Sequence, residues 1–460
     1  MKIRFLGAAR TVTGACFHII VNDIQMLVDC GMHQGENADA INKAQFHFTP
    51  EKINYLFLTH AHIDHSGLIP KLVKDGFKGK IITTPATADL TEIMLYDSAN
   101  IQEKDAEWLN KKALRAGRDA VFEPLYSIED VKAAISFFEK TQYGKIKHLG
   151  QGVKYRFIDA GHILGSGTLE IWYQDSPVEK KIVFSGDIGK KSNPIINDPQ
   201  QTDAADYMVI ESTYGNRQHK SMEDTLDELV EAVKVTFKKG GNVLIPAFAI
   251  GRTQDILYTL NKLVRAGRLP RLNVYVDSPL AEDATKVYLA HPECFDKEAM
   301  EIFKDRKGGA IKLHFTTEIK DSQKINKKKS GAVIIAGSGM CEGGRIRHHL
   351  KHNLWRSECC MIFSGYQAKG TLGRKIVDGA KTVYVLGEEI AVKAKIYTIG
   401  GFSAHADQNE LLQWLGALSN KPEVFIVHGE ENASLEFERR VQEKFGFITH
   451  VPQKGEEFEI

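Results

Sequence analysis

The chain has 460 residues, of which 60 are Lys or Arg and 59 are Asp or Glu, so its formal net charge is +1. At roughly 100–200 residues per domain this length predicts about two to four domains, and it excludes a small fold held by disulfides. With 43% hydrophobic and 26% charged residues the composition is that of a globular protein, which excludes a largely disordered chain.

The sequence contains no pattern typical of a leader peptide, a membrane-spanning helix or a disulfide framework. The chain opens with an alternating strand-like run instead of a charged-then-apolar leader. No apolar run approaches the roughly 18 residues of a membrane-spanning helix. The six cysteines show no C-x-x-C spacing, which favours reduced thiols. We therefore expect a cytoplasmic protein with no membrane partner, and the sequence leaves a homo-oligomer open.

Strand-like and helix-like patterns alternate along the chain. The first stretch has short apolar or alternating runs, typical of strands, at residues 2–6, 16–21, 24–29, 53–59, 153–159, 168–173 and 181–185. Residues 86–138 have apolar positions at helical intervals and predict helices. From residue 207 strand-then-helix units repeat, with strands expected at 208–211, 243–246, 272–276, 332–336 and 360–363. Strand patterns resume after residue 380.

These patterns predict two domains in three segments. Residues 1–208 form the first part of a β-rich domain, and residues 209–380 form an inserted α/β domain with a mainly parallel sheet. Residues 381–460 return to the first domain and complete it.

The strongest chemical signal follows the predicted strand at 53–59. His60, His62, Asp64 and His65 lie within six residues at the end of this strand, where a rigid scaffold presents ligands well. So many ionisable groups in one turn are not buried together without a cation that compensates them. The sequence therefore predicts a metal site at this strand end.

Two further candidates stand in glycine-rich turns beside strands. His162 lies in A-G-H-I-L-G-S-G and Asp187 lies in S-G-D-I-G. Each alone fits an ordinary turn equally well. Together with the first cluster they supply more ligands than one tetrahedral ion uses.

The H-x-H-x-D-H pattern at residues 60–65, followed by an isolated His and an Asp after a strand, resembles the metallo-β-lactamase fold. This family has an αββα sandwich with two metal ions at the edge of its sheets. The resemblance implies two Zn²⁺ ions per chain. The implied ligands are His60, His62 and His162 for one ion, Asp64 and His65 for the second, Asp187 as a bridge, and Asp29 as an orienting carboxylate. The pair of ions suits hydrolysis by a shared hydroxide, but the signature also covers lactamases, thioesterases, lactonases and sulfatases.

Three more residues narrow the resemblance to the β-CASP branch of this fold. Glu211 lies in I-E-S-T-Y-G, His405 in G-F-S-A-H-A-D and His428 in V-H-G-E. By resemblance His428 completes the second zinc site, and Glu211 holds His405 so that its imidazolium protonates the leaving oxygen. A histidine at the position of His428 goes with the RNA-cleaving members. The expected catalytic residues are therefore Asp64, Glu211 and His405.

The predicted insert also carries features of a phosphate-binding surface. Its strand-to-helix turns are rich in glycine and direct backbone N–H groups and helix N-termini toward one crevice. The candidate RNA contacts in these turns are Arg252, Ser278, Ser338, Arg345, Tyr366, Lys369 and Arg374. The cations suit a phosphate backbone, and Tyr366 suits stacking on a base.

The hypothesis is a zinc-dependent ribonuclease that hydrolyses phosphodiester bonds of single-stranded RNA with a metal-bound hydroxide, in RNA processing or decay. Endonuclease action and additional 5′-exonuclease action both fit. One alternative is another hydrolase of the fold that acts on DNA or a small ester. The other is an RNA-binding scaffold with an inactive site, against which the complete set of ligand residues argues.

Overall fold

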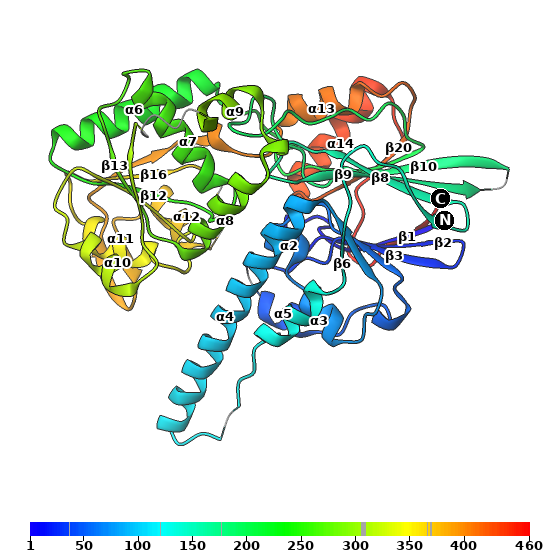
Figure 1. The fold of residues 1–460 in the computed structure, drawn as a ribbon, viewed down its shortest axis with the longest axis horizontal. Coiled ribbons are helices and arrows are strands. Elements are labelled where there is room, and N and C mark those ends of the chain that lie inside the picture. The colour runs from blue at the N-terminus through cyan, green and yellow to red at the C-terminus, as the bar shows by residue number, and fades with distance from the viewer. Residues whose placement is uncertain (36, 120, 176, 305–309, 366, 369) are drawn as a thin grey trace. The chain divides into compact units, whose positions relative to one another are not determined.

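The computed structural model describes residues 1–35, 37–119, 121–175, 177–304, 310–365, 367–368 and 370–460 (Figure 1). Its internal contacts divide the chain into two compact units. Unit 1 comprises Met1–Lys191, Asn197–Gln218 and His405–Ile460, and unit 2 comprises Ser192–Ile196 and His219–Ala404. None of the described helices combines the length and the apolar character that crossing a bilayer requires.

Unit 1 contains two seven-stranded sheets. The first has the order β22-β1-β2-β3-β4-β5-β6, with bounds β22 Glu457–Glu459, β1 Lys2–Gly7, β2 Cys16–Val21, β3 Ile24–Val28, β4 Tyr55–Phe57, β5 Lys80–Thr83 and β6 Phe138–Lys140. The second has the order β21-β20-β11-β10-β9-β8-β7, with bounds β21 Thr449–His450, β20 Glu423–Val427, β11 Tyr207–Glu211, β10 Val178–Phe184, β9 Gly167–Asp175, β8 Val153–Asp159 and β7 Lys147–Gly150. Strands far apart in the sequence are therefore neighbours in both sheets.

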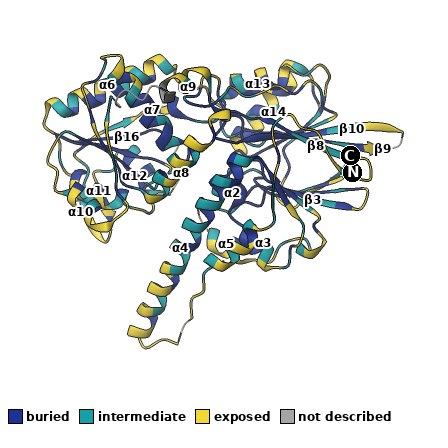
Figure 2. Cartoon of the chain, in the orientation of Figure 1, coloured by how far each residue is buried: buried dark blue, intermediate teal, exposed yellow. Residues whose placement is uncertain are grey.

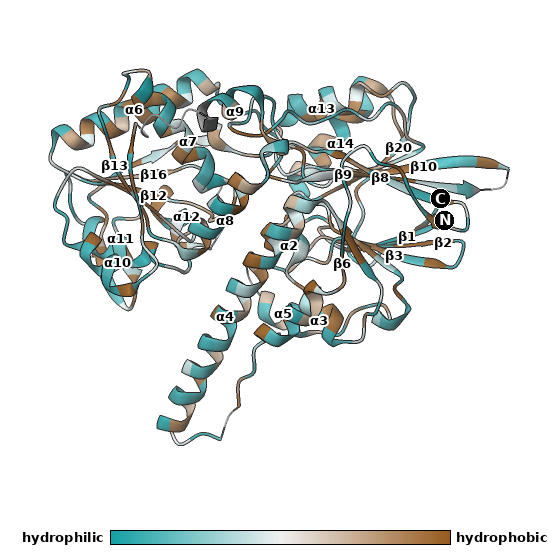
Figure 3. Ribbon diagram, in the orientation of Figure 1, coloured by the Kyte–Doolittle hydropathy of each residue, from teal (hydrophilic) through white to brown (hydrophobic). Residues whose placement is uncertain are grey.

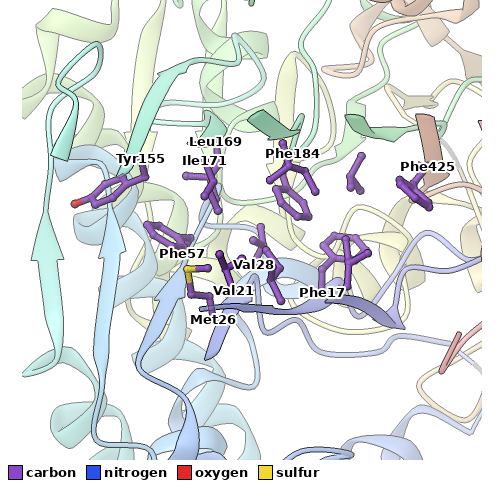
Figure 4. Close-up of a cluster of buried hydrophobic side chains, with 14 of the residues drawn as sticks. Phe17, Val21, Met26, Val28, Phe57, Tyr155, Leu169, Ile171, Phe184 and Phe425 are labelled. Carbon is purple, nitrogen blue, oxygen red and sulfur yellow. The ribbon is translucent and has the colours of Figure 1, made fainter. Parts of the chain in front are cut away.

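The two sheets of unit 1 pack face to face through one buried cluster (Figure 4). Alternate residues of each strand point inward because side chains alternate between the faces of a sheet. The ring centroids of Phe57 and Tyr155 are 4.9 Å apart, and those of Phe17 and Phe184 are 5.9 Å apart, so each pair joins one sheet to the other. The strands accordingly have a more hydrophobic colour than the helix surfaces in Figure 3.

Helices cover the outer faces of this sandwich. Helices α3, α4 and α5 pack on the first sheet, and α13 and α14 pack on the second. The helix bounds of unit 1 are α1 Ala38–Lys43, α2 Ile63–Ser66, α3 Ile69–Lys74, α4 Pro85–Arg115, α5 Ile128–Ile135, α13 Gln408–Gly416 and α14 Glu431–Phe445, with a 3₁₀ turn at Pro50–Lys52. The predicted αββα sandwich is confirmed.

Unit 2 is built on a six-stranded sheet in which every pairing is parallel. Its order is β14-β13-β15-β12-β16-β19, with bounds β14 Lys312–Phe315, β13 Asn273–Val276, β15 Ala332–Ala336, β12 Val243–Pro246, β16 Cys360–Phe363 and β19 Lys395–Thr398. The helices are α6 Met222–Lys238, α7 Arg252–Arg265, α8 Pro279–Ala290, α9 Lys297–Lys304, α10 Ile319–Asn326, α11 Ile346–Asn353 and α12 Leu372–Val377. A hairpin of β17 Thr382–Val385 and β18 Glu388–Ala391 and 3₁₀ turns at Pro292–Cys294 and Gly400–Phe402 complete the unit. The predicted mainly parallel α/β fold is confirmed.

The segment 381–404 packs in unit 2, although the sequence pattern groups it with residues 381–460 of the first domain. The physical reason is β19, which pairs in parallel with β16 at the edge of the unit 2 sheet. As domain limits, the predicted boundaries 1–208, 209–380 and 381–460 stay a prediction.

Candidate metal centre

Every predicted metal ligand lies in unit 1, in turns at the ends of strands. His60 and His62 lie between β4 and α2, and Asp64 and His65 lie in the single turn of α2. The remaining candidates follow other strands: His162 after β8, Asp187 after β10 and His428 after β20. The parallel pairing of β10, β11 and β20 brings the carboxyl ends of these three strands to the same edge of the second sheet.

The first group consists of His60, His62, His162 and Asp187, whose ligand atoms all lie within 4.8 Å of one another. His62 Nδ1 lies 3.1 Å from His60 Nε2 and 3.3 Å from His162 Nε2. Asp187 Oδ2 lies 3.4 Å from His60 Nε2 and 3.5 Å from His162 Nε2. Three imidazole nitrogens and one carboxylate oxygen therefore converge on one point.

The second group consists of Asp64, His65 and His428. His65 Nε2 lies 3.1 Å from His428 Nε2, which lies 3.7 Å from Asp64 Oδ2. Asp187 Oδ1 lies 3.5 Å from His65 Nε2 and 3.4 Å from His428 Nδ1. The Asp187 carboxylate thus directs one oxygen to each group.

The donors in both groups fit metal ions. Asp187 Oδ1 is buried and has no hydrogen-bond partner among the described residues. A buried acceptor without a partner costs about 1–3 kcal/mol. A cation between the groups would satisfy this oxygen and the converging imidazole lone pairs. Imidazole and carboxylate ligands without cysteine suit zinc, and also suit other divalent metals of the first transition row.

The electrostatics of the first group keep its ligands in the forms that bind metal. Burial, together with the neighbouring His60, lowers the pKa of His62 to about 3. Burial also lowers the pKa of His60 and of His162. Burial alone would raise the pKa of Asp187, but the adjacent histidines, His428 foremost, hold it well below its usual range. Neutral imidazoles and an ionised carboxylate are the species that coordinate a metal.

Asp29 orients one of the candidate ligands. Its buried carboxylate accepts a hydrogen bond from His65 Nδ1 at 2.8 Å, which leaves His65 Nε2 facing the second group. The same carboxylate accepts from the backbone N–H of Thr59 at 2.8 Å and from Thr59 Oγ1 at 2.9 Å. Partners of this kind fix the tautomer and the ring plane of a ligating histidine.

Glu211 and His405 meet beside the first group. His405 Nδ1 lies 3.2 Å from both carboxylate oxygens of Glu211, which is fully buried and also accepts from the backbone N–H of Ile188 at 2.7 Å. The rings of His405 and His162 have centroids 4.5 Å apart. Burial alone would lower the pKa of His405, but the charges of Glu211 and Asp187 outweigh it and raise this pKa to about 9. The pair is therefore arranged as a histidine acid held by a carboxylate.

Two threonines of this site were missed from the sequence. Thr59 links Asp29 to the strand end, as above, and Thr213 Oγ1 lies 3.1 Å from His428 Nδ1 and donates to the His428 carbonyl oxygen at 3.0 Å. Both stand close to motif residues in the sequence, because Thr59 directly precedes His60 and Thr213 lies two residues after Glu211. A threonine hydroxyl within two residues of a motif residue is the sequence signal that would have identified Thr59 and Thr213.

The predicted RNA contacts lie in unit 2, in turns that follow the strands of its parallel sheet. Arg252 opens α7 after β12, Ser278 caps α8 after β13, and Ser338 follows β15, where its Oγ accepts from the Gly343 N–H at 3.2 Å. Arg374 in α12 pairs with Asp378 at 2.8 Å. Tyr366 and Lys369 lie outside the described residues. The described candidates therefore share one edge of the sheet, and their contact with RNA stays a prediction.

Arg345 is engaged inside unit 2. Its guanidinium donates to Asp277 Oδ1 at 2.7 Å and to the carbonyl oxygen of Thr316 at 2.8 Å. Asp277, which is buried, also accepts from His349 Nε2 at 2.7 Å and from Ser322 Oγ at 2.6 Å. Burial alone would raise the pKa of Asp277, but these donors hold it well below its usual range. Arg345 therefore compensates a buried carboxylate, whatever its contact with RNA.

Asp277→Asn is expected to destabilise unit 2 by about 3 kcal/mol at pH 7, because it leaves the cation of Arg345 without its buried partner. Since the folded-state pKa of Asp277 is lowered, the wild-type contribution is present above about pH 4 and is lost as the pH falls further. Hydrogen exchange of the β13 and β15 amides at pH 7 measures the effect. The exposed Asp283→Asn on α8 is the control, and equal protection in both variants would contradict the prediction.

Three family profiles match the chain. They are the Metallo-beta-lactamase superfamily over residues 11–235, the Beta-Casp domain over 253–376 and the Zn-dependent metallo-hydrolase RNA specificity domain over 389–452.

Curated proteins resemble the chain over nearly its whole length. It is 37% identical over 437 residues to Ribonuclease TTHA0252 of Thermus thermophilus, which covers 95% of this chain and 94% of that protein. It is 30% identical to the RNase J-like protein of Methanocaldococcus jannaschii, with 98% of both chains covered, and 30% identical to transcription termination factor FttA of the same organism, with 98% of this chain and 70% of FttA covered. A crystal structure of a protein of unknown function from Enterococcus faecalis has a TM-score of 0.56 at 14% identity, with 99% of both chains covered, and shares the fold.

Proposed function

We propose that this chain, which belongs to the β-CASP branch of the metallo-β-lactamase superfamily, is a metal-dependent ribonuclease that hydrolyses phosphodiester bonds of single-stranded RNA. The observation that carries the proposal is the Asp187 carboxylate, which faces two groups of ligand residues at once, beside the Glu211–His405 pair. Relatives named as ribonucleases and the match to an RNA specificity domain support RNA as the substrate.

We assign two Zn²⁺ ions per chain to this centre. His60, His62 and His162 would hold one ion, Asp64, His65 and His428 would hold the other, and Asp187 would bridge them. When bound, such ions lower the pKa of a water molecule and neutralise charge on the phosphate. Asp29 fixes the ring of His65 so that its Nε2 is available to the second ion.

Two side chains of the protein, His405 and Asp64, take part in proton transfer. His405, held by Glu211, gives a proton to the leaving 3′ oxygen, so the products are a 3′-hydroxyl and a 5′-phosphate. Asp64 is the most exposed side chain of its group, 21% against 5% for His428, and its carboxylate accepts a hydrogen bond from the attacking water. Arg252, Ser278, Ser338 and Arg374 in unit 2 are proposed to contact RNA phosphates. A cytoplasmic location and a homo-oligomer stay predictions.

Cleavage of a 5′-labelled single-stranded RNA by the purified protein tests this function. We expect cuts that need zinc, disappear after chelation and return on re-addition, and no cuts in a DNA strand of matching sequence. Internal products indicate endonuclease action, and mononucleotides released from the 5′ end indicate exonuclease action. Intact RNA after incubation with zinc-loaded protein, together with turnover of a lactone or of the DNA strand, would replace this proposal with another hydrolase activity.

A further inference from the structure

Helix α4 links the candidate metal centre to a distant surface. Its N-cap Thr84 and its residue Thr87 both donate side-chain hydrogen bonds to the carbonyl oxygen of Gly165, at 2.7 and 2.8 Å. Gly165 lies in the same turn as His162. The helix has 31 residues, so at 1.5 Å per residue it extends about 46 Å from this turn. Figure 1 shows it leaving the sheets of unit 1.

The two halves of α4 differ in burial (Figure 2). The first half packs on the first sheet, where Leu95 and Ala99 are fully buried. In the second half Ile101, Trp108 and Leu114 are 50%, 60% and 76% exposed. The segment that follows α4 contacts this half of the helix. Asn110 Nδ2 donates to the carbonyl oxygen of Phe122 at 2.9 Å, and the backbone N–H of Phe122 donates to Asn110 Oδ1 at 2.7 Å. Trp108 therefore contributes little to the core of unit 1.

Cations flank Trp108 on the exposed face of the helix. Lys104 and Lys112 stand one turn before and one turn after it, on the same face, and Lys112 Nζ lies 5.0 Å from a Trp108 ring centroid. Residues 111–118 include two lysines and two arginines and no acidic residue. Lys111 pairs with Glu107 at 3.7 Å. Residues 103–118 together carry five basic and three acidic side chains, and the exposed Asp105 lies three residues before Trp108 on the same face. The end of α4 thus presents an exposed aromatic ring between two lysines, with a small excess of cations around it.

We propose that this face of α4 is a second contact for single-stranded RNA, in which a base stacks on Trp108 and phosphates contact Lys104, Lys112 and Arg115. The inference rests on the proposed ribonuclease function and extends its substrate contacts. An aromatic platform between cations is the arrangement that binds single strands with little sequence preference. The run of basic residues at 111–118 favours a polyanion over an apolar protein partner.

The length of α4 gives the proposal a measurable consequence. Trp108 lies about 35 Å along the helix from its first residue. At about 3.4 Å per stacked nucleotide, a strand reaching from the metal centre to Trp108 needs about ten nucleotides. A hexamer engages only the metal centre, whereas a 24-mer with its cleavage site in the middle reaches both places.

The test compares KM for a 6-nucleotide and a 24-nucleotide RNA. For Trp108→Ala, and for Lys104→Gln combined with Lys112→Gln, we expect KM for the 24-mer to rise about tenfold with kcat unchanged, and KM for the hexamer to change by less than about twofold. The double lysine variant should also lower the salt dependence of 24-mer binding, by about 1.4 in the log–log slope for two lost phosphate contacts. The exposed Lys132→Gln on α5 is the matched control.

Fluorescence anisotropy of a labelled 24-mer on chelator-treated protein separates this inference from the proposed function. If the wild type binds the 24-mer but no RNA is cleaved, the function fails and the variants still decide the role of α4 by their affinity. Equal affinity of the wild type and both variants for the 24-mer would overturn the inference, and so would an equal KM increase for both RNA lengths. Failure of the wild type to bind the 24-mer would overturn it as well.

Discussion

Asp187→Asn is expected to reduce RNA cleavage by about 10³-fold or more, because the substitution removes the carboxylate that faces both ligand groups. Metal ions supply several kcal/mol of stabilisation to the developing charge, and each 1.4 kcal/mol corresponds to about a tenfold change in rate. Asparagine has nearly the same shape as aspartate, so the fold should persist. Affinity for zinc should fall by at least about 10–100-fold.

Two measurements check this expectation together. Mass spectrometric metal analysis of the purified variant gives its zinc content, and the labelled RNA assay gives its rate. The exposed Asp203→Asn in the same unit should match the wild type in both. A variant with full zinc content and normal cleavage would show that Asp187 is no ligand, and the bridging assignment would fail.

His405→Ala is expected to slow RNA cleavage by about 10²–10⁴-fold, the usual contribution of a positioned acid or base. The loss should depend on the leaving group. A ribose 3′ oxygen needs a proton as it leaves, whereas p-nitrophenolate leaves without one. With bis(p-nitrophenyl) phosphate the variant should therefore lose less than about tenfold.

Glu211→Gln distinguishes a proton donor from a structural residue. It keeps the size of the side chain but removes the charge that holds His405, so RNA cleavage should fall while turnover of the chromogenic ester largely persists. Zinc content should stay at the wild-type level in both variants, and the exposed His148→Ala should have no effect. If turnover of RNA and turnover of the chromogenic ester fall by the same factor, His405 does not act as the acid for the leaving oxygen.

The convergence of the candidate ligand residues could be predicted because its signal is local. His60 to His65 stand together after a strand, and the later candidates each follow a strand within a short glycine-containing motif. Neighbouring parallel strands carry their ends to the same edge of a sheet, so sequence position alone indicates convergence. Their assignment to individual metal ions stays a prediction.

The features that the sequence did not predict depend on contacts between residues that are far apart in the chain. The sequence does not show that β19 pairs with β16, the contact by which residues 381–404 pack in unit 2. Arg345 looked like a free cation in a glycine-rich turn, because its partner Asp277 lies 68 residues earlier. The apolar spacing of residues 86–138 predicted helices, but it did not show that large apolar side chains in the second half of α4, such as Trp108 and Leu114, are exposed.

The strand order of unit 1 also sets when the enzyme becomes competent during synthesis. β20 lies beside β11, and β22 pairs with β1, so the sheets are complete only after the last strands are made. His405 and His428 are separated from Glu211 by His219–Ala404, the main segment of unit 2, which is a parallel α/β body with its own core. A nascent chain that has exposed only its first 400 residues therefore holds several ligands but no assembled centre. Nuclease activity should therefore first arise only after β20 and His428 have been synthesised and β20 has paired with β11.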